Sequence, residues 1–143
     1  MVRACVPSFL AHSRPVVLVW KRRDRALRRR LLEGGDFSGA NLKRASLAKL
    51  DIPRARLRGA NLSGSDLRRI DLRWSDLSSA NLKGSTLDGA LFDGANLTGA
   101  DLRNATLRGT VFEGARLSGI RLRGATWDET TVWPKGFVPV EGP

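Results

Sequence analysis

A period of five residues constrains this chain more than any other feature of its sequence. From Phe37 to Trp127 a large apolar residue returns at every fifth position, in nineteen successive units that cover 35–129. Fourteen of these central residues are Leu, and none is polar. An α-helix repeats about every 3.6 residues and a strand alternates its sides, so neither produces this period. The chain must therefore turn a corner in every unit, with the central residue pointing inward.

The residues around each centre indicate how the corners stack. Eleven units have Ala two residues before the centre, and eleven have Gly two residues after it, where a corner favours glycine. A register of twenty residues places Phe92 over Phe112 and Leu91 over Val111, whereas a register of twenty-five separates the two Phe residues. The same register aligns two polar columns: Asn41, Asn61, Asn81 and Thr86, Thr106, Thr126. The sequence therefore predicts four units per coil, with the Asn side chains hydrogen-bonded between coils.

The repeated motif A(N/D)LxG, seen for example at 60–64 and 80–84, resembles that of the pentapeptide-repeat family. This resemblance implies an all-β solenoid, a right-handed quadrilateral β-helix, here of about five coils. The segment 131–137 also resembles the tail that closes the last coil in many bacterial members. Some members dimerise at this end, so the resemblance makes a homodimer through the C-terminal end an expectation.

Four segments are expected along the chain. Residues 1–15 have no clear period and are predicted to be a disordered arm. Residues 16–34 have the pattern of a basic amphipathic helix with an N-terminal capping role over the first coil, since the end of a solenoid needs cover. The same helix could present its arginines to nucleic acid or an anionic membrane surface. The β-helix is expected over 35–134, followed by a C-terminal tail at 135–143.

The charge of the chain is uneven. The net charge is +11, and residues 1–75 contain eighteen Lys or Arg against six Asp or Glu. The longest apolar run, Val16–Trp20, is too short to span a bilayer, so we do not expect an integral membrane protein. Polar residues at 12–15 interrupt the apolar stretch that a secretory signal would need, which favours a cytoplasmic location.

Catalytic chemistry finds little support in the sequence. His12 is the only histidine and Cys5 the only cysteine, and neither belongs to a recognisable motif. Most acidic residues of the repeats occupy the Asn/Asp position of the motif, which explains them without a catalytic role. We therefore predict no enzyme activity, no catalytic residues, no cofactor and no metal site.

Two surfaces are candidate binding sites. We name each face of the coil by its first central residue. On the Ile52 face, apolar residues occupy outward positions, which suggests a docking patch unless the tail folds back over them. This candidate interaction patch consists of Trp74, Leu91, Val111 and Trp133. A basic column on the Leu42 face and the predicted helix together form a candidate anion-binding site, unless these charges are merely solvated. The column consists of Lys43, Lys83, Arg103 and Arg123, and the helix contributes Arg22, Arg25, Arg28, Arg29 and Arg30.

The sequence thus predicts a non-enzymatic scaffold that binds another protein. One alternative is an anion-binding module for nucleic acid or an acidic lipid surface, through the basic N-terminal half. A second alternative comes from the family resemblance, because some pentapeptide-repeat proteins act on DNA gyrase, apparently by imitating duplex DNA. A net charge of +11 argues against imitation of a polyanion. The sequence does not identify the partner.

Overall fold

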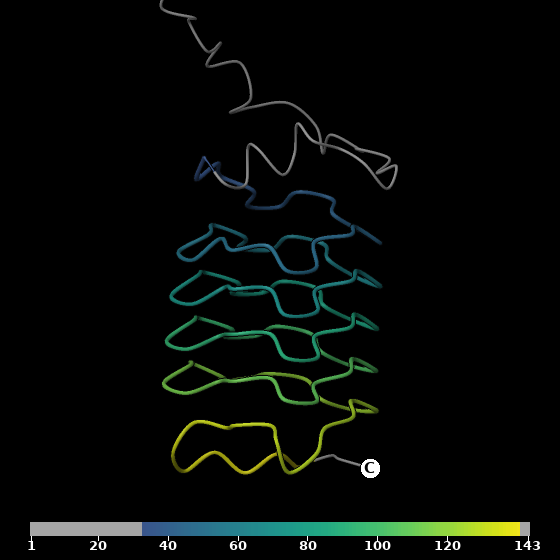
Figure 1. Cartoon of the computed structure of the whole chain (residues 1–143), viewed down its shortest axis with the longest axis vertical. Coiled ribbons are helices and arrows are strands. Elements are labelled where there is room, and N and C mark those ends of the chain that lie inside the picture. The colour runs from purple at the N-terminus through teal and green to yellow at the C-terminus, as the bar shows by residue number, and fades with distance from the viewer. Residues whose placement is uncertain (1–32, 141–143) are drawn as a thin grey trace, which may run out of the picture.

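The computed structural model describes residues 33–140 as a stack of four-sided coils (Figure 1). Sixteen parallel bridges join successive coils, and fifteen of them connect residues that are twenty positions apart, such as Asn41 with Asn61 and Asn61 with Asn81. Each unit supplies one bridging residue, so the described residues contain no longer strand and no helix. The predicted register of four units per coil is confirmed, and each face has five rungs.

Backbone hydrogen bonds hold each coil to the next. The N–H of Leu42 donates to Asn61 O (2.7 Å), and the N–H of Arg44 donates to Ser63 O (2.9 Å). In the opposite direction, the N–H of Asn61 donates to Ala40 O (2.9 Å). This set of three bonds recurs on all four faces. It satisfies the backbone at the surface of a narrow core, where an unpaired buried group would be costly.

The corner of each unit lies two residues after its centre. A hydrogen bond from the residue three positions after the centre closes the turn, as from Ala45 N–H to Leu42 O (3.1 Å). All eighteen corner residues from Gly39 to Gly124 have a positive φ, including seven that are not glycine. A turn of this kind requires positive φ at its third residue, which explains the glycine periodicity in the sequence.

The central residues form a continuous buried column, with an aromatic stack on one face. Phe92 stacks on Phe112 with ring centroids 5.4 Å apart, and Phe112 stacks on Trp133 at 5.0 Å. Trp133 is half-buried against the core, so its predicted place in the outward patch is wrong. The cause is one additional residue in the last coil, where Val111 pairs with Val132 at a separation of twenty-one. A shift of one residue exchanges inward and outward positions.

The Asn/Asp position of the motif has a local role. The side-chain oxygen of Asn61 accepts the N–H of Ser63 (3.1 Å), and that of Asn81 accepts the N–H of Lys83 (3.1 Å). Both bonds lie inside one unit, so the predicted bonds between coils are wrong for Asn61 and Asn81, whereas on the Phe37 face Asn96 Nδ2 does donate to Asp76 Oδ1 in the coil above (3.4 Å). A short side chain that bonds two residues ahead stabilises the start of the turn.

Some predictions lie outside the described residues. The structure does not describe residues 1–32 and 141–143. The predicted arm, nearly all of the predicted capping helix and the arginines assigned to that helix therefore lie outside the described residues. Within 33–140, no helix is long and apolar enough to cross a bilayer.

Three carboxylates in the Asn/Asp position form ion pairs inside their own units. Arginine Nη2 lies 2.7 Å from the carboxylate of Asp66, 2.6 Å from that of Asp71 and 2.7 Å from that of Asp101. The donor is in each case the arginine two residues ahead: Arg68, Arg73 and Arg103. These side-chain hydrogen bonds hold the pKa of all three carboxyl groups below the ordinary value, and partial burial opposes the shift.

We predict that replacing Gly84 with Ala destabilises the fold through backbone conformation alone. Gly84 has φ +65°, and a Cβ placed there would meet nothing within 4 Å. The expected loss in the free energy of unfolding is about 1 kcal/mol, the scale of forcing a side chain into the left-handed region. Urea denaturation measures it. The control is Ser118→Ala, outside the corner position, which we expect to change stability by less than about 0.5 kcal/mol. Equal effects would contradict the argument.

We also predict that acid destabilises the protein through these carboxylates. Because their pKa is lower in the folded state than in the unfolded chain, they contribute stability above the ordinary Asp range, and this contribution disappears as the pH falls through the folded pKa. The urea midpoint should therefore be constant near neutral pH and fall below about pH 4. Asp101→Asn should weaken this acid dependence. A midpoint that stays constant down to about pH 2 would refute the prediction.

Candidate functional site

The Ile52 face carries an apolar column on its outer surface. Parallel bridges place Leu91 beside Val111 and Val111 beside Val132. The side chains of Leu91 and Val111 are half-buried, whereas Val132 is 43% exposed. Sequence reasoning missed Val132 because of the extra residue before it. The signal was present, because 131–133 has a small residue, a variable one and a large apolar one, the order found in most other units, but shifted by one position.

Trp74 is a second exposed apolar residue of this face, located at its corner one coil above Leu91. It occupies a corner position with φ 60°, and it is 65% exposed. Its ring lies against Gly94 in the next coil, so closely that a Cβ on Gly94 would collide with the indole. Gly94 is therefore favoured by its corner conformation, and any side chain there would force the Trp74 ring to move. We call the set Trp74, Leu91, Val111 and Val132 the apolar patch.

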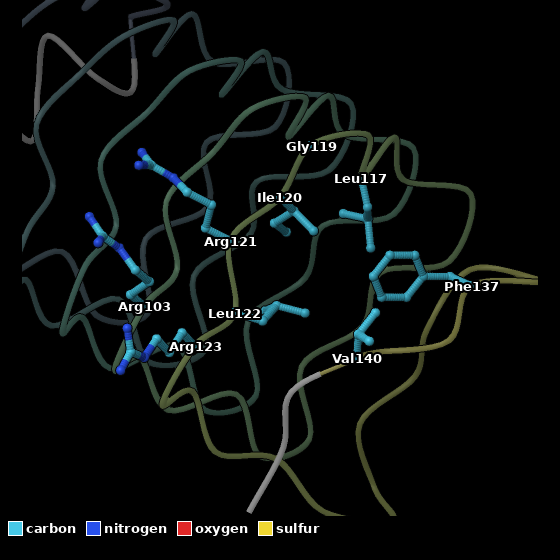
Figure 2. A pocket seen from close by; sticks show the side chains of 9 residues that line it. All are labelled: Arg103, Leu117, Gly119, Ile120, Arg121, Leu122, Arg123, Phe137 and Val140. Carbon is cyan, nitrogen blue, oxygen red and sulfur yellow. The ribbon is translucent and has the colours of Figure 1, made fainter.

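The tail lies across the open end of the last coil. Phe137 packs on Trp133, with ring centroids 5.3 Å apart, and Phe137 and Val140 lie near Leu117 and Leu122 (Figure 2). Val138 and Val140 are exposed. The described part of the tail thus covers the end of the core. Its aromatic contacts are with the core and not with the apolar patch.

Acidic side chains flank the apolar patch. Asp71 is buried, and its carboxylate accepts hydrogen bonds from Arg73, which keeps its pKa low. Asp93 and Glu113 occupy the same outward position in adjacent coils, two residues beyond Leu91 and Val111. Neither forms an ion pair with another described residue within 4.0 Å. The flank therefore presents Asp93 and Glu113 beside an apolar surface, and Arg73, one coil above Asp93 in the same column, interacts electrostatically with Asp93.

The basic column on the Leu42 face is only partly free. Lys43, Lys83 and Arg123 are exposed. Arg103 is instead held by Asp101, with Nε 2.9 Å from Oδ1 and Nη2 2.7 Å from Oδ2. Arg121 Nη2 lies 3.3 Å from the same carboxylate. Sequence reasoning did not assign this role to Asp101, although its position one coil above Arg121 could have indicated it.

A cavity of about 480 Å³ opens at the C-terminal end of the stack. Figure 2 shows its composition: three arginines gather on one side, the tail residues lie on the opposite side, and Ile120 and Leu122 lie between them. The cavity is lined by Arg103, Leu117, Gly119, Ile120, Arg121, Leu122, Arg123, Phe137 and Val140. Such a site suits a ligand that is apolar at its centre and negatively charged on one side.

Comparisons with known proteins identify the repeat. The pentapeptide-repeat family matches in 8 copies, over residues 27–59, 55–94 and 90–126. One similar solved structure is that of a pentapeptide repeat protein, Rfr23, from the cyanobacterium Cyanothece 51142. The two sequences are 33% identical, the match covers 75% of this chain and 96% of that one, and the TM-score is 0.37. No curated protein matches this chain.

Two further solved structures come from the cyanobacterium Nostoc. A pentapeptide repeat protein is 34% identical, covering 80% of this chain and 88% of that chain, with a TM-score of 0.44. HetL, a pentapeptide repeat protein involved in heterocyst differentiation regulation, is 29% identical, covering 74% of this chain and 56% of that chain, with a TM-score of 0.34. Because the family model matches 8 copies of its repeat across more than half of the chain, this chain belongs to the pentapeptide-repeat family.

Proposed function

We propose that this protein is a non-enzymatic scaffold that binds a protein partner through the apolar patch. The observation that carries the proposal is the exposure of Trp74 and Val132 on a face whose neighbouring outward positions are also apolar. On the other three faces the equivalent positions hold Asp, Asn, Ser, Thr or Arg. Contiguous apolar surface on a folded protein is typical of an interaction site.

The physical properties of the patch suit protein binding. Tryptophan is enriched among residues that dominate interface energetics, and the Trp74 ring packs against Gly94. The residues of the patch are on coils joined by backbone hydrogen bonds, such as Leu91 N–H to Ile70 O (2.9 Å) and Val111 N–H to Ala90 O (3.0 Å). A preformed surface loses little conformational entropy on binding.

The charges beside the patch indicate the chemistry of the partner. Asp93 and Glu113 would attract lysine or arginine, and the face of the Trp74 ring also favours a cation. We infer that the partner presents large apolar side chains flanked by basic ones. Polar side chains of the repeats are used within the turns, as in the Ser78 hydroxyl to Asp76 bond (2.7 Å), so the proposal is one of binding without chemistry.

The proposal predicts a preference between two classes of short labelled peptides, whose apolar residues are flanked either by Lys and Arg or by Asp and Glu. The basic class should bind the patch. Leu91→Thr/Val111→Thr should weaken this binding about tenfold or more, a loss of about 1.4 kcal/mol. Fluorescence anisotropy with the full chain measures both effects.

The double variant should remain folded, because Thr already occupies the equivalent position at Thr86 and Thr106. The matched control is Asn96→Thr, the same position on the Phe37 face, which should leave binding unchanged. Equal binding of the two peptide classes, or full binding by the double variant, would exclude the patch as the site.

A second candidate function is binding of a polyanion. It is favoured by the charge asymmetry of the chain, because residues 1–75 hold eighteen of the 25 Lys and Arg residues. Imitation of DNA, as in proteins acting on DNA gyrase, is disfavoured by the net charge of +11. Electrostatic binding to nucleic acid does not require base recognition.

This second candidate predicts that a random-sequence DNA duplex binds the full chain at low salt and dissociates steeply as salt rises. Anisotropy over a salt series is the measurement. Lys43→Glu/Lys83→Glu should reduce both the affinity and the salt dependence if the exposed basic column takes part. Absence of binding at low salt would eliminate nucleic acid as a partner.

A further inference from the structure

The last coil ends in a backbone edge whose hydrogen-bonding groups have no partner among residues 33–140. Between the fourth and fifth coils, the Leu42 face makes three bonds: Leu102 N–H to Arg121 O (2.9 Å), Asn104 N–H to Arg123 O (3.0 Å) and Arg121 N–H to Ala100 O (3.1 Å). On the far side of the fifth coil, the equivalent groups are the N–H of Leu122, the N–H of Gly124 and the carbonyl of Ile120. Residues 33–140 supply no partner for these three groups. We call the backbone of 120–124 the C-terminal edge.

Two exposed arginines stand on this edge. Arg121 and Arg123 occupy the two outward positions on either side of Leu122. Arg121 shares the Asp101 carboxylate with Arg103, whereas Arg123 has no ion pair with a described residue. Two guanidinium groups therefore share one carboxylate, Arg123 adds a further positive charge, and the edge carries an excess of positive charge. Figure 2 shows the three arginines gathered on the same side of the cavity.

The cavity continues the core beyond the last coil. Leu62, Leu82 and Leu102 each have an apolar central residue of the Leu42 face above and below them, but Leu122 has one only above, at Leu102. The cavity of about 480 Å³ lies beside Leu122 and Ile120, with Phe137 and Val140 opposite the arginines. It therefore offers an apolar side chain the position that a sixth coil would fill.

We infer that the C-terminal edge binds an extended segment of another protein with the pattern acidic, apolar, acidic. The segment adds as a parallel strand, which is a common mode of peptide recognition at a free sheet edge. Its first acidic residue lies beside Arg121, with its N–H donating to Ile120 O and its carbonyl accepting from Leu122 N–H. Its apolar side chain enters the cavity. Its second acidic residue lies beside Arg123, with its carbonyl accepting from Gly124 N–H.

Charge favours this occupant over a second copy of the chain. Opposite charges on adjacent strands stabilise the pair, and like charges destabilise it. An identical edge would bring a second Arg121 and Arg123 to this end of the stack. An acidic segment instead neutralises the excess charge and makes the same three backbone bonds that join every pair of coils on this face.

The test is an NMR titration of the isotope-labelled full chain with a blocked peptide containing Asp-Leu-Asp. Because so few residues are held, the expected Kd is on the order of 0.1–1 mM. A matched Lys-Leu-Lys peptide should bind at least about tenfold more weakly. In the wild-type protein, the Asp-Leu-Asp peptide should slow hydrogen exchange at the amides of Leu122 and Gly124. This readout requires no variant.

A charge-reversal variant provides a second, independent test. Arg121→Glu/Arg123→Glu should invert the preference between the two peptides. The matched control is Arg56→Glu/Arg58→Glu, which changes the same two repeat positions in the second coil, where the edge is already paired with the third, and it should leave the preference unchanged. Thermal unfolding checks that both variants are folded.

Three outcomes would overturn the inference. The first is equal affinity for the acidic and basic peptides, and the second is unchanged hydrogen exchange at Leu122 and Gly124 when the peptide is saturating. The third is a stable dimer in sedimentation that protects these two amides without peptide, since a second copy would then occupy the edge. Failure of this test leaves the apolar patch unaffected, because the patch lies on a different face and is probed by basic peptides.

Discussion

The structure depends on the backbone hydrogen bonds that join each coil to the next at a separation of twenty residues. In the interior of the stack, a typical unit donates two N–H groups toward the following coil and one toward the preceding coil. This arrangement works only if every unit has five residues, because one extra residue exchanges inward and outward positions. The single exception is in the last coil, where Val132 pairs with Val111 one residue late and no further coil follows within the described residues.

Because the backbone makes the contacts between coils, the outward side chains can vary with little effect on the fold. Asp71, Leu91 and Val111 are consecutive rungs of one column, yet they combine a buried carboxylate with half-buried aliphatic residues. Fold and surface are thus specified by different positions of the same repeat. This separation explains why a five-residue motif predicts the shape of the chain and leaves its partner unspecified.

The parts of the fold that follow from periodicity were predictable from the sequence. The aromatic pair Phe92 and Phe112 indicated the register, and the glycine period indicated the corners. Interactions that depend on side-chain direction were not predictable in this way. Asn61 could have bonded along its own unit or across to the next coil, and both arrangements satisfy the same pattern. The position of Trp133 depended on one additional residue in a segment without repeated copies to compare.

The ends of a stacked coil pose a problem that its middle does not, because an open sheet edge can recruit further chains. In this protein the tail shields the apolar core through Phe137, but none of its described residues bonds to the backbone of the last coil. Charged residues such as Arg121 and Arg123 are a usual means of discouraging indiscriminate pairing at such an edge. Charge that repels an identical edge is also selective, because it leaves acidic strands as the favoured ones. Protection of the fold and choice of a ligand would then come from the same two side chains.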